Sequence, residues 1–150
     1  KQIIANGYKC SSLFFTTTDL TDNSFVIAED FIRRGLARNE DEFYQCTGEE
    51  LTLYWHAPYH NVTPEIINYS ESAGYTYVPA VYRYYDFDIV APQTLIHEYY
   101  SKAVRNGGGV IPVTIGFSQI RNFDYLYNHM DLLICSLLDA DFEFVTVSEY

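Results

Sequence analysis

Short apolar runs alternate with amphipathic, helix-length segments along the whole chain, and this alternation limits the possible folds most strongly. The expected strands are residues 10–17, 51–55, 75–84, 110–115 and 142–147. Helical spacing of apolar residues covers the segments 25–38, 64–73, 94–105 and 124–138. Residues 1–8 are expected to be the tail of a helix that ends at Asn6-Gly7, and the acidic segment 39–50, interrupted by Gly48, is expected as a short helix or a loop. Strands that alternate with helices of about a dozen residues favour an α/β fold, a parallel sheet with crossover helices that is either open or closed into a barrel.

The strand at 51–55 leads into the stretch Trp55-His56-Ala57-Pro58-Tyr59-His60, which holds the only Trp of the chain. Pro58 cannot continue a ladder of hydrogen bonds, so the strand ends before it. Thr63 and Pro64 then give a helix-start signal, an N-cap followed by Pro at the first helical position. In α/β folds, ligands bind where strands end and helices begin. These aromatic and imidazole groups are therefore either ligand-facing or part of a loop that closes over the core.

The composition disfavours some classes of partner. A net charge of −11 is unsuited to nucleic acid or an anionic membrane surface, since both require a basic patch. No run reaches the roughly 18 apolar residues of a membrane span. Hydrophobic residues make up 48% of the chain, so we expect a folded single domain over residues 1–150. The aromatic share of 17% suits a large core, a sugar site or a protein interface.

Three Cys residues, Cys10, Cys46 and Cys135, are scattered without a CxxC spacing. One disulfide with a thiol left over and three reduced thiols both fit this number, so the Cys residues do not indicate the compartment. The chain opens on Lys1-Gln2-Ile3-Ile4 without an initiator Met, as expected of a mature or trimmed segment.

His56 and His60 are four residues apart, a spacing that suits two metal ligands on a helix. Pro58 lies between them and excludes a helix interior. The imidazoles can still converge across a tight turn, with Asp86 or Asp88 adding a carboxylate. A metal site and a structural role both stay open, and no residue is assigned as a metal ligand.

Several stretches follow one another in a characteristic order: Asn6-Gly7-Tyr8-Lys9-Cys10-Ser11-Ser12-Leu13-Phe14-Phe15-Thr16, Thr47-Gly48-Glu49-Glu50-Leu51 with the stretch 55–60, Ser72-Ala73-Gly74-Tyr75, Asp86-Phe87, Gly107-Gly108-Gly109-Val110-Ile111-Pro112-Val113-Thr114-Ile115-Gly116, and Phe142-Glu143-Phe144-Val145-Thr146-Val147-Ser148-Glu149. In order and spacing they resemble the polysaccharide deacetylase (NodB-homology, carbohydrate esterase) family. The family motifs that they resemble include Arg-x-Pro-Tyr-Gly, the Ala-Gly-Tyr turn, Asp-Trp and a closing Val-Thr-Val-Ser-Glu strand. The resemblance covers nearly the whole chain.

The resemblance implies a distorted (β/α) barrel of the polysaccharide deacetylase type, here incomplete at the N-terminus. Members of this family remove N-acetyl groups from glycans such as peptidoglycan or chitin, which implies a glycan partner and an extracellular or cell-surface location. A divalent metal such as zinc, held by an Asp and two His, polarises the acetamide carbonyl and binds the attacking water. A second Asp acts as base, and a His on a late strand acts as acid.

The chain departs from the family at its catalytic positions. The Thr-Phe-Asp-Asp-Gly motif, which carries the base and the metal Asp, is not found, and residues 18–47, where the metal His pair is expected, contain no His. The acid His falls on Thr114, which cannot donate a proton to a leaving amine at neutral pH. The motif Arg falls on His56 and the motif Gly falls on His60.

Asp86 keeps the identity that the family has at its position. The resemblance implies that it supports the catalytic charge network, here by pairing with His56 instead of an Arg. Asp86 and His56 are therefore the candidate catalytic residues. The candidate substrate-binding residues line the implied glycan groove: Trp55, Tyr59, His60, Phe87 and Thr114, with Tyr82 beside them.

These observations favour a polysaccharide deacetylase-like protein whose activity is reduced or lost, either as a pseudoenzyme or as part of a longer protein that carries the missing motifs. The alternative is a non-catalytic module that binds a glycan or a protein in the same groove. A barrel without its first strand exposes an unpaired edge, which favours homo-oligomers or pairing with another chain. A third interpretation is a structural subunit that binds neither metal nor sugar.

Overall fold

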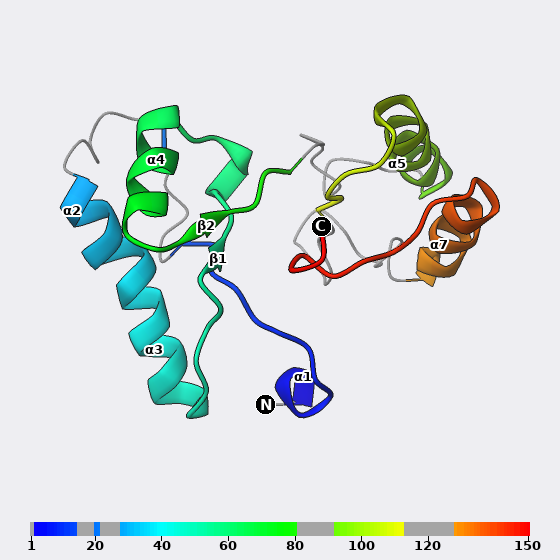
Figure 1. Cartoon of the computed structure of the whole chain (residues 1–150). Helices are drawn as coiled ribbons and strands as arrows, with labels where there is room; N and C mark the ends of the chain where they lie inside the picture. Colours follow the sequence, from blue (N-terminus) through cyan, green and yellow to red (C-terminus); the bar gives the residue numbers. More distant parts are fainter. Residues whose placement is uncertain (1, 15–19, 22–27, 81–91, 113–127) are drawn as a thin grey trace. The chain divides into compact units, whose positions relative to one another are not determined.

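The computed structural model describes residues 2–14, 20–21, 28–80, 92–112 and 128–150. The chain divides into two compact units, Lys1–Pro79 and Ala80–Tyr150 (Figure 1). Each unit contains a hydrophobic core cluster. The expectation of a single domain over residues 1–150 stays a prediction.

The first unit is built on a short parallel sheet. Strand β1, Tyr54–Trp55, pairs in parallel with strand β2, Thr76–Tyr77. Along its opposite edge, β1 forms a parallel bridge with Ser12, whose amide donates to the Tyr54 carbonyl at 3.2 Å and whose carbonyl accepts from the His56 amide at 2.9 Å. The parallel pairing expected from the sequence is therefore confirmed, with strands shorter than expected.

A continuous helical run lies beside this sheet (Figure 1). It consists of α2, Ala28–Phe31, the π-helix η2, Ile32–Leu36, and α3, Ala37–Thr47. The acidic segment after residue 38, expected as a short helix or a loop, is helical up to the end of α3. The run stops at Gly48, whose φ of 78° is the left-handed conformation that glycine adopts at little cost.

Local signals set the other helix ends of the first unit. Helix α1, Gln2–Ala5, ends just before Asn6-Gly7, as expected. Helix α4, Pro64–Ser72, starts at the predicted N-cap, where the Thr63 hydroxyl accepts a hydrogen bond from the amide of Ile66 at 3.4 Å. The start and stop signals in the sequence are therefore confirmed for these helices.

Two polar contacts fasten the helices to the sheet. The indole Nε1 of Trp55 donates to the hydroxyl of Ser70 on α4 at 2.9 Å. The side-chain amide of Asn39 on α3 donates to the hydroxyl of Ser12 at 2.7 Å. Because an unpaired buried polar group costs free energy, these contacts fix the positions of α4 and α3 on the sheet.

The core of the first unit is largely aromatic. Its buried members are Phe14, Leu20, Phe31, Leu36, Trp55 and Ala57. Phe14 stacks on Phe31 with ring centroids 5.0 Å apart, and Phe31 meets Trp55 edge-on at 5.3 Å. Each such pair adds about 0.5–1.5 kcal/mol beyond the burial of apolar area. Part of the high aromatic content of the chain therefore serves the core.

In the second unit, helix α5, Pro92–Asn106, packs against helix α7, Met130–Asp139. Their contact buries six side chains: Leu95, Ile96, Tyr99, Ala103, Leu133 and Leu137. The hydroxyl of Tyr99 donates to the carbonyl of Pro112 at 3.0 Å, which ties the segment after α5 back to that helix. No described helix combines the length and the apolar character needed to cross a lipid bilayer.

The prediction of a strand at 142–147 is wrong, and so is the prediction of a strand at 110–115 for its described residues, 110–112. Residues 110–112 and 142–147 have irregular backbone, without a ladder partner among the described residues. A strand needs a neighbour for its amide and carbonyl groups, and an apolar run does not reveal where that neighbour lies. The described residues form no closed barrel, so the expected distorted (β/α) barrel is not established by them.

Candidate functional site

His56 lies directly after β1, and the backbone after β2 holds its ring. The Nδ1 atom of His56 lies 2.8 Å from the carbonyl oxygen of Val78, the residue that follows β2. A carbonyl oxygen can only accept, so Nδ1 carries a proton and donates it. In the neutral ring, the lone pair that can accept or bind a ligand is then on Nε2.

His60 ends the 3-10 turn η3, Pro58–His60. Its Nδ1 atom is hydrogen-bonded to Nε2 of His56, and the two ring centroids are 4.5 Å apart. Tyr59 and His60 have φ values of 54° and 58°, in the left-handed region that non-glycine residues seldom adopt. The two imidazoles therefore converge across a tight turn, the arrangement that the sequence allows once Pro58 excludes a helix.

The metal ligands implied by the family resemblance, one Asp and two His, have no counterpart in the described residues. Among them, no group of three or more His, Cys, Asp or Glu side chains is placed to hold a metal ion. The pair His56 and His60 supplies two nitrogen atoms on one loop, which is a different donor set. The residues that the structure describes therefore do not fit the metal centre of the family.

Trp55 and Tyr59, both expected to contact substrate, have opposite environments. Trp55 is 0% exposed, and its ring packs against Phe31 and Tyr77. This placement corrects the expectation that Trp55 faces a ligand: β1 has partners along both edges and helices pack on it, so the ring has no face for a sugar. Tyr59 is 47% exposed and lies on the turn between the two imidazoles.

The other candidate residues, Asp86, Phe87 and Thr114, lie outside the described residues, as do Tyr82 and Asp88. The pairing of Asp86 with His56 therefore stays a prediction. The same holds for Phe87 and Thr114 as residues that line a glycan groove.

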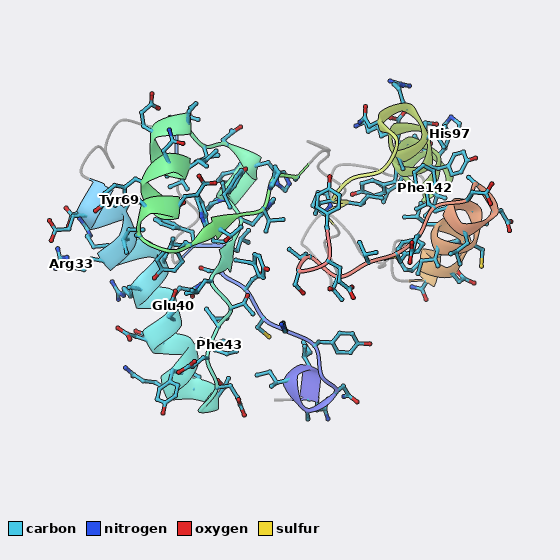
Figure 2. All side chains as sticks on the ribbon, viewed as in Figure 1. Arg33, Glu40, Phe43, Tyr69, His97 and Phe142 are labelled. Atoms are coloured by element: carbon cyan, nitrogen blue, oxygen red, sulfur yellow. The ribbon has the colours of Figure 1, made fainter. Side chains whose placement is uncertain are left out.

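The first unit contains a second polar pair, which the sequence does not predict. Tyr75, just before β2, donates a hydrogen bond to the carboxylate of Glu40, which lies on α3 (Figure 2). Burial and this carboxylate raise the pKa of Tyr75 to about 12, and burial also raises the pKa of Glu40. The Oε1 atom of Glu40 is buried and has no hydrogen-bond partner in the described structure. No sequence signal distinguishes Glu40 from its acidic neighbours, because its partner lies far away along the chain.

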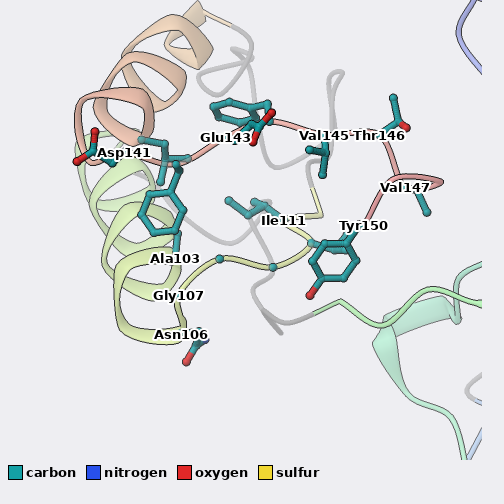
Figure 3. A pocket seen from close by; sticks show the side chains of 16 residues that line it. Ala103, Asn106, Gly107, Ile111, Asp141, Glu143, Val145, Thr146, Val147 and Tyr150 are labelled. Atoms are coloured by element: carbon teal, nitrogen blue, oxygen red, sulfur yellow. The ribbon is translucent and has the colours of Figure 1, made fainter.

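A cavity of about 600 Å³ lies in the second unit, between residues 107–111 and the C-terminal segment (Figure 3). Figure 3 shows Ile111 and Val145 on facing sides of this cavity, with Tyr150 beside it. Three apolar side chains of the C-terminal segment are also exposed: Phe144, Val145 and Val147. The lining therefore combines apolar side chains with polar groups, among them the carboxylates of Asp141 and Glu143.

No family model and no curated protein sequence matches the chain. Among solved structures, the chain is similar to the wild-type crystal structure of a CE4 family pseudoenzyme from Bacillus anthracis, with a TM-score of 0.67 and 11% sequence identity. The similarity covers 99% of this chain and 48% of that structure, so the chain spans about half the length of its structural relative. At this identity the similarity shows the fold alone, which is of the CE4, polysaccharide deacetylase-like type.

Proposed function

We propose that this chain is a polysaccharide deacetylase-like protein with reduced or lost activity, and that it binds an N-acetylated glycan at the sheet edge after β1. One observation carries this proposal: the loop that resembles the Arg-x-Pro-Tyr-Gly motif holds two imidazoles, hydrogen-bonded to each other and to Val78. The Arg of the family motif would offer five hydrogen-bond donors in a rigid fork. His56 cannot replace it, because the proton on its Nδ1 is already donated to the Val78 carbonyl. The similarity to the fold of a CE4 pseudoenzyme supports the same proposal.

In this proposal the parallel strands belong to a distorted (β/α) barrel. The sequence β1, α4, β2 is a parallel βαβ unit, the repeating element of such barrels. Ligands of these barrels bind at the carboxyl ends of the strands, which is where His56 and the exposed ring of Tyr59 lie. The family resemblance also implies Asp86, Phe87 and Thr114 as site residues, and these three lie outside the described residues.

Glycan binding and acetate release together test the proposal. The chain is titrated calorimetrically with N-acetylated chito-oligosaccharides and peptidoglycan fragments, and acetate is measured in the same samples. We expect saturable binding without acetate release. Tyr59→Ala should weaken binding about tenfold, or ~1.4 kcal/mol, because an exposed aromatic ring for stacking on a sugar is lost.

Tyr44→Ala is the matched control, because Tyr44 is also exposed but lies on α3. It should leave glycan affinity unchanged. Turnover of the glycan with stoichiometric acetate release would contradict the loss of activity. Failure of every N-acetylated glycan to bind would contradict the glycan assignment.

The alternative function is a protein-binding module, which the exposed apolar side chains beside the cavity of the second unit favour. Such side chains mark protein interfaces when they gather in one patch. This alternative predicts that the chain self-associates or binds a protein, and that Val145→Asp prevents the association while glycan binding is absent. Sedimentation analysis of wild type and of Val145→Asp tests this alternative, because only the protein-binding function predicts an association that the substitution removes.

A further inference from the structure

We propose that His56 and His60 bind one divalent transition-metal ion of the borderline class, which comprises Zn²⁺, Ni²⁺ and Cu²⁺. The two ligand atoms are Nε2 of His56 and Nδ1 of His60, which face each other across the turn after β1. This inference does not rest on the proposed glycan binding. It also uses none of the ligand positions that the family resemblance implies.

The carbonyl of Val78 prepares His56 as a ligand. A metal-binding His nearly always donates the proton of its other ring nitrogen to a carbonyl or carboxylate, which fixes the tautomer and the ring orientation. His56 makes this contact through Nδ1 at 2.8 Å. Its Nε2 lone pair therefore points at His60 before any ion arrives.

The backbone turn holds His60 opposite this lone pair. The amide of His60 donates to the carbonyl of Ala57 at 3.0 Å, and the amide of Asn61 donates to the carbonyl of Pro58 at 3.2 Å. With a φ of 58°, His60 occupies a conformation that favours glycine. Unfavourable backbone conformations of this kind cluster at functional sites, where the position of a side chain is required.

Metal binding replaces the proton between the two rings. In the neutral, metal-free pair, the Nδ1 proton of His60 is donated to the Nε2 lone pair of His56. When the ion binds, the proton of His60 moves from Nδ1 to Nε2, so the His60 ring stays neutral. The lone pairs on Nε2 of His56 and Nδ1 of His60 then both coordinate the ion. Zn–N bonds of about 2.0–2.1 Å in a tetrahedral site place the two nitrogens roughly 3.3 Å apart, which a small rotation of the rings provides.

The donor set also predicts selectivity. Imidazole nitrogen suits zinc, nickel and copper, whereas Mg²⁺ and Ca²⁺ require oxygen ligands. The general order of stability for nitrogen sites then places Cu²⁺ above Ni²⁺. We therefore expect binding of the transition metals and no binding of Mg²⁺.

Calorimetric titration of the full chain with ZnCl₂ tests the site directly. We expect saturation near one equivalent, and a loss of affinity of roughly tenfold or more in His56→Ala and in His60→Ala. The fluorescence of Trp55, the only Trp of the chain and the residue before His56, gives a second readout, because bound Cu²⁺ or Ni²⁺ should quench it. His97→Ala is the control, since it removes an exposed imidazole from α5 (Figure 2) and should leave the affinity unchanged.

The proposal is overturned if wild type binds no Zn²⁺, if His60→Ala binds it as tightly as wild type, or if His97→Ala is the variant that loses binding. Nitrogen NMR of wild type with ¹⁵N-labelled imidazoles needs no variant and remains decisive if a variant fails to fold. Zn²⁺ should shift Nε2 of one His and Nδ1 of another. A shift of the same ring nitrogen in both residues would also overturn the proposal.

Discussion

At position 35, the helical run approaches the segment before the sheet so closely that only glycine fits. A Cβ atom added to Gly35 would overlap the ring of Phe14, which is buried and stacked on Phe31. Alanine has a helix propensity up to about 1 kcal/mol better than glycine, so Gly35→Ala would be stabilising if the ring could move. Because the ring is confined, we expect a net destabilisation of about 1–3 kcal/mol, measured by urea unfolding.

Arg34→Ala controls for the general effect of a substitution in the π-helix, because this side chain is 63% exposed. It should change the free energy of unfolding by less than about 0.5 kcal/mol. In the Gly35→Ala background, Phe14→Leu should recover part of the loss by making room. A Gly35→Ala chain as stable as wild type would show that the contact with Phe14 relaxes freely.

The hydroxyl of Ser70 satisfies the indole nitrogen of Trp55, and both residues are fully buried. Ser70→Ala leaves this N–H without a partner, so we expect a loss of about 1–3 kcal/mol. Ser72→Ala on the same helix removes an exposed hydroxyl that donates to the Tyr69 carbonyl, and should cost much less. Unfolding followed by Trp55 fluorescence measures both variants, and equal losses would mean that the buried contact adds nothing specific.

At the scale of the element, the hydrogen bond between Glu40 and Tyr75 links α3 to the start of β2. At neutral pH, burial of the charged Glu40 carboxylate costs folding free energy. Burial raises the pKa of Glu40 above its ordinary value of 4.5. A carboxyl whose pKa is raised by folding favours the folded state below the unfolded pKa, and that contribution is lost as the pH rises through the folded pKa. Glu40→Gln keeps an acceptor for Tyr75 and removes the charge. We therefore expect it to stabilise the chain at pH 8, by less than about 1 kcal/mol after solvent screening.

Unfolding at pH 8 and at pH 4 tests this sign. The advantage of Glu40→Gln should shrink toward zero at the lower pH, where the wild-type carboxyl is protonated. Glu42→Gln on the same helix makes an equal change of net charge at an exposed position and serves as the control. A destabilised Glu40→Gln chain at pH 8 would show that the charged hydrogen bond outweighs the burial of the carboxylate.

Helices proved more predictable from the sequence than strands because their determinants are local. Thr63 with Pro64 set the start of α4, and Gly48 set the end of α3, each within a few residues of the groups that they satisfy. Strands depend on partners that are distant along the chain. The segment 142–147 has a strand-like apolar pattern, but the described residues provide no ladder for it.

In the candidate site, too, the features that local sequence determines were predictable, and those that depend on distant partners were not. The end of β1 followed from Pro58, and convergence of the two His residues across a tight turn was one of the alternatives that the sequence allowed. The burial of Trp55 did not follow from the sequence, because a ring beside a loop and a ring in a core have the same sequence signature. Its burial results from packing against Phe31 and Tyr77, residues on other elements of the first unit.

At the scale of the whole molecule, the pattern of elements is retained where residue identities are not. The similarity to the CE4 pseudoenzyme covers 99% of the chain with only 11% identity. A hydrophobic core tolerates extensive substitution as long as its volume and hydrophobic pattern are kept, whereas catalysis depends on particular side chains. A shared fold therefore does not determine which chemistry the loop after β1 supports; the side chains of that loop do.

The two hydrophobic cores share no residue, so a defect in one should leave the other intact. Leu137→Ala removes a buried side chain from the contact of α5 with α7 and should destabilise the second unit by about 2–5 kcal/mol. Amide hydrogen exchange of the full chain should then accelerate in α5 and α7 while β1 and α4 keep wild-type rates. Leu138→Ala, an exposed neighbour on α7, should alter neither set of rates. Equal acceleration in β1 and α4 would show instead that the two units unfold as one cooperative structure.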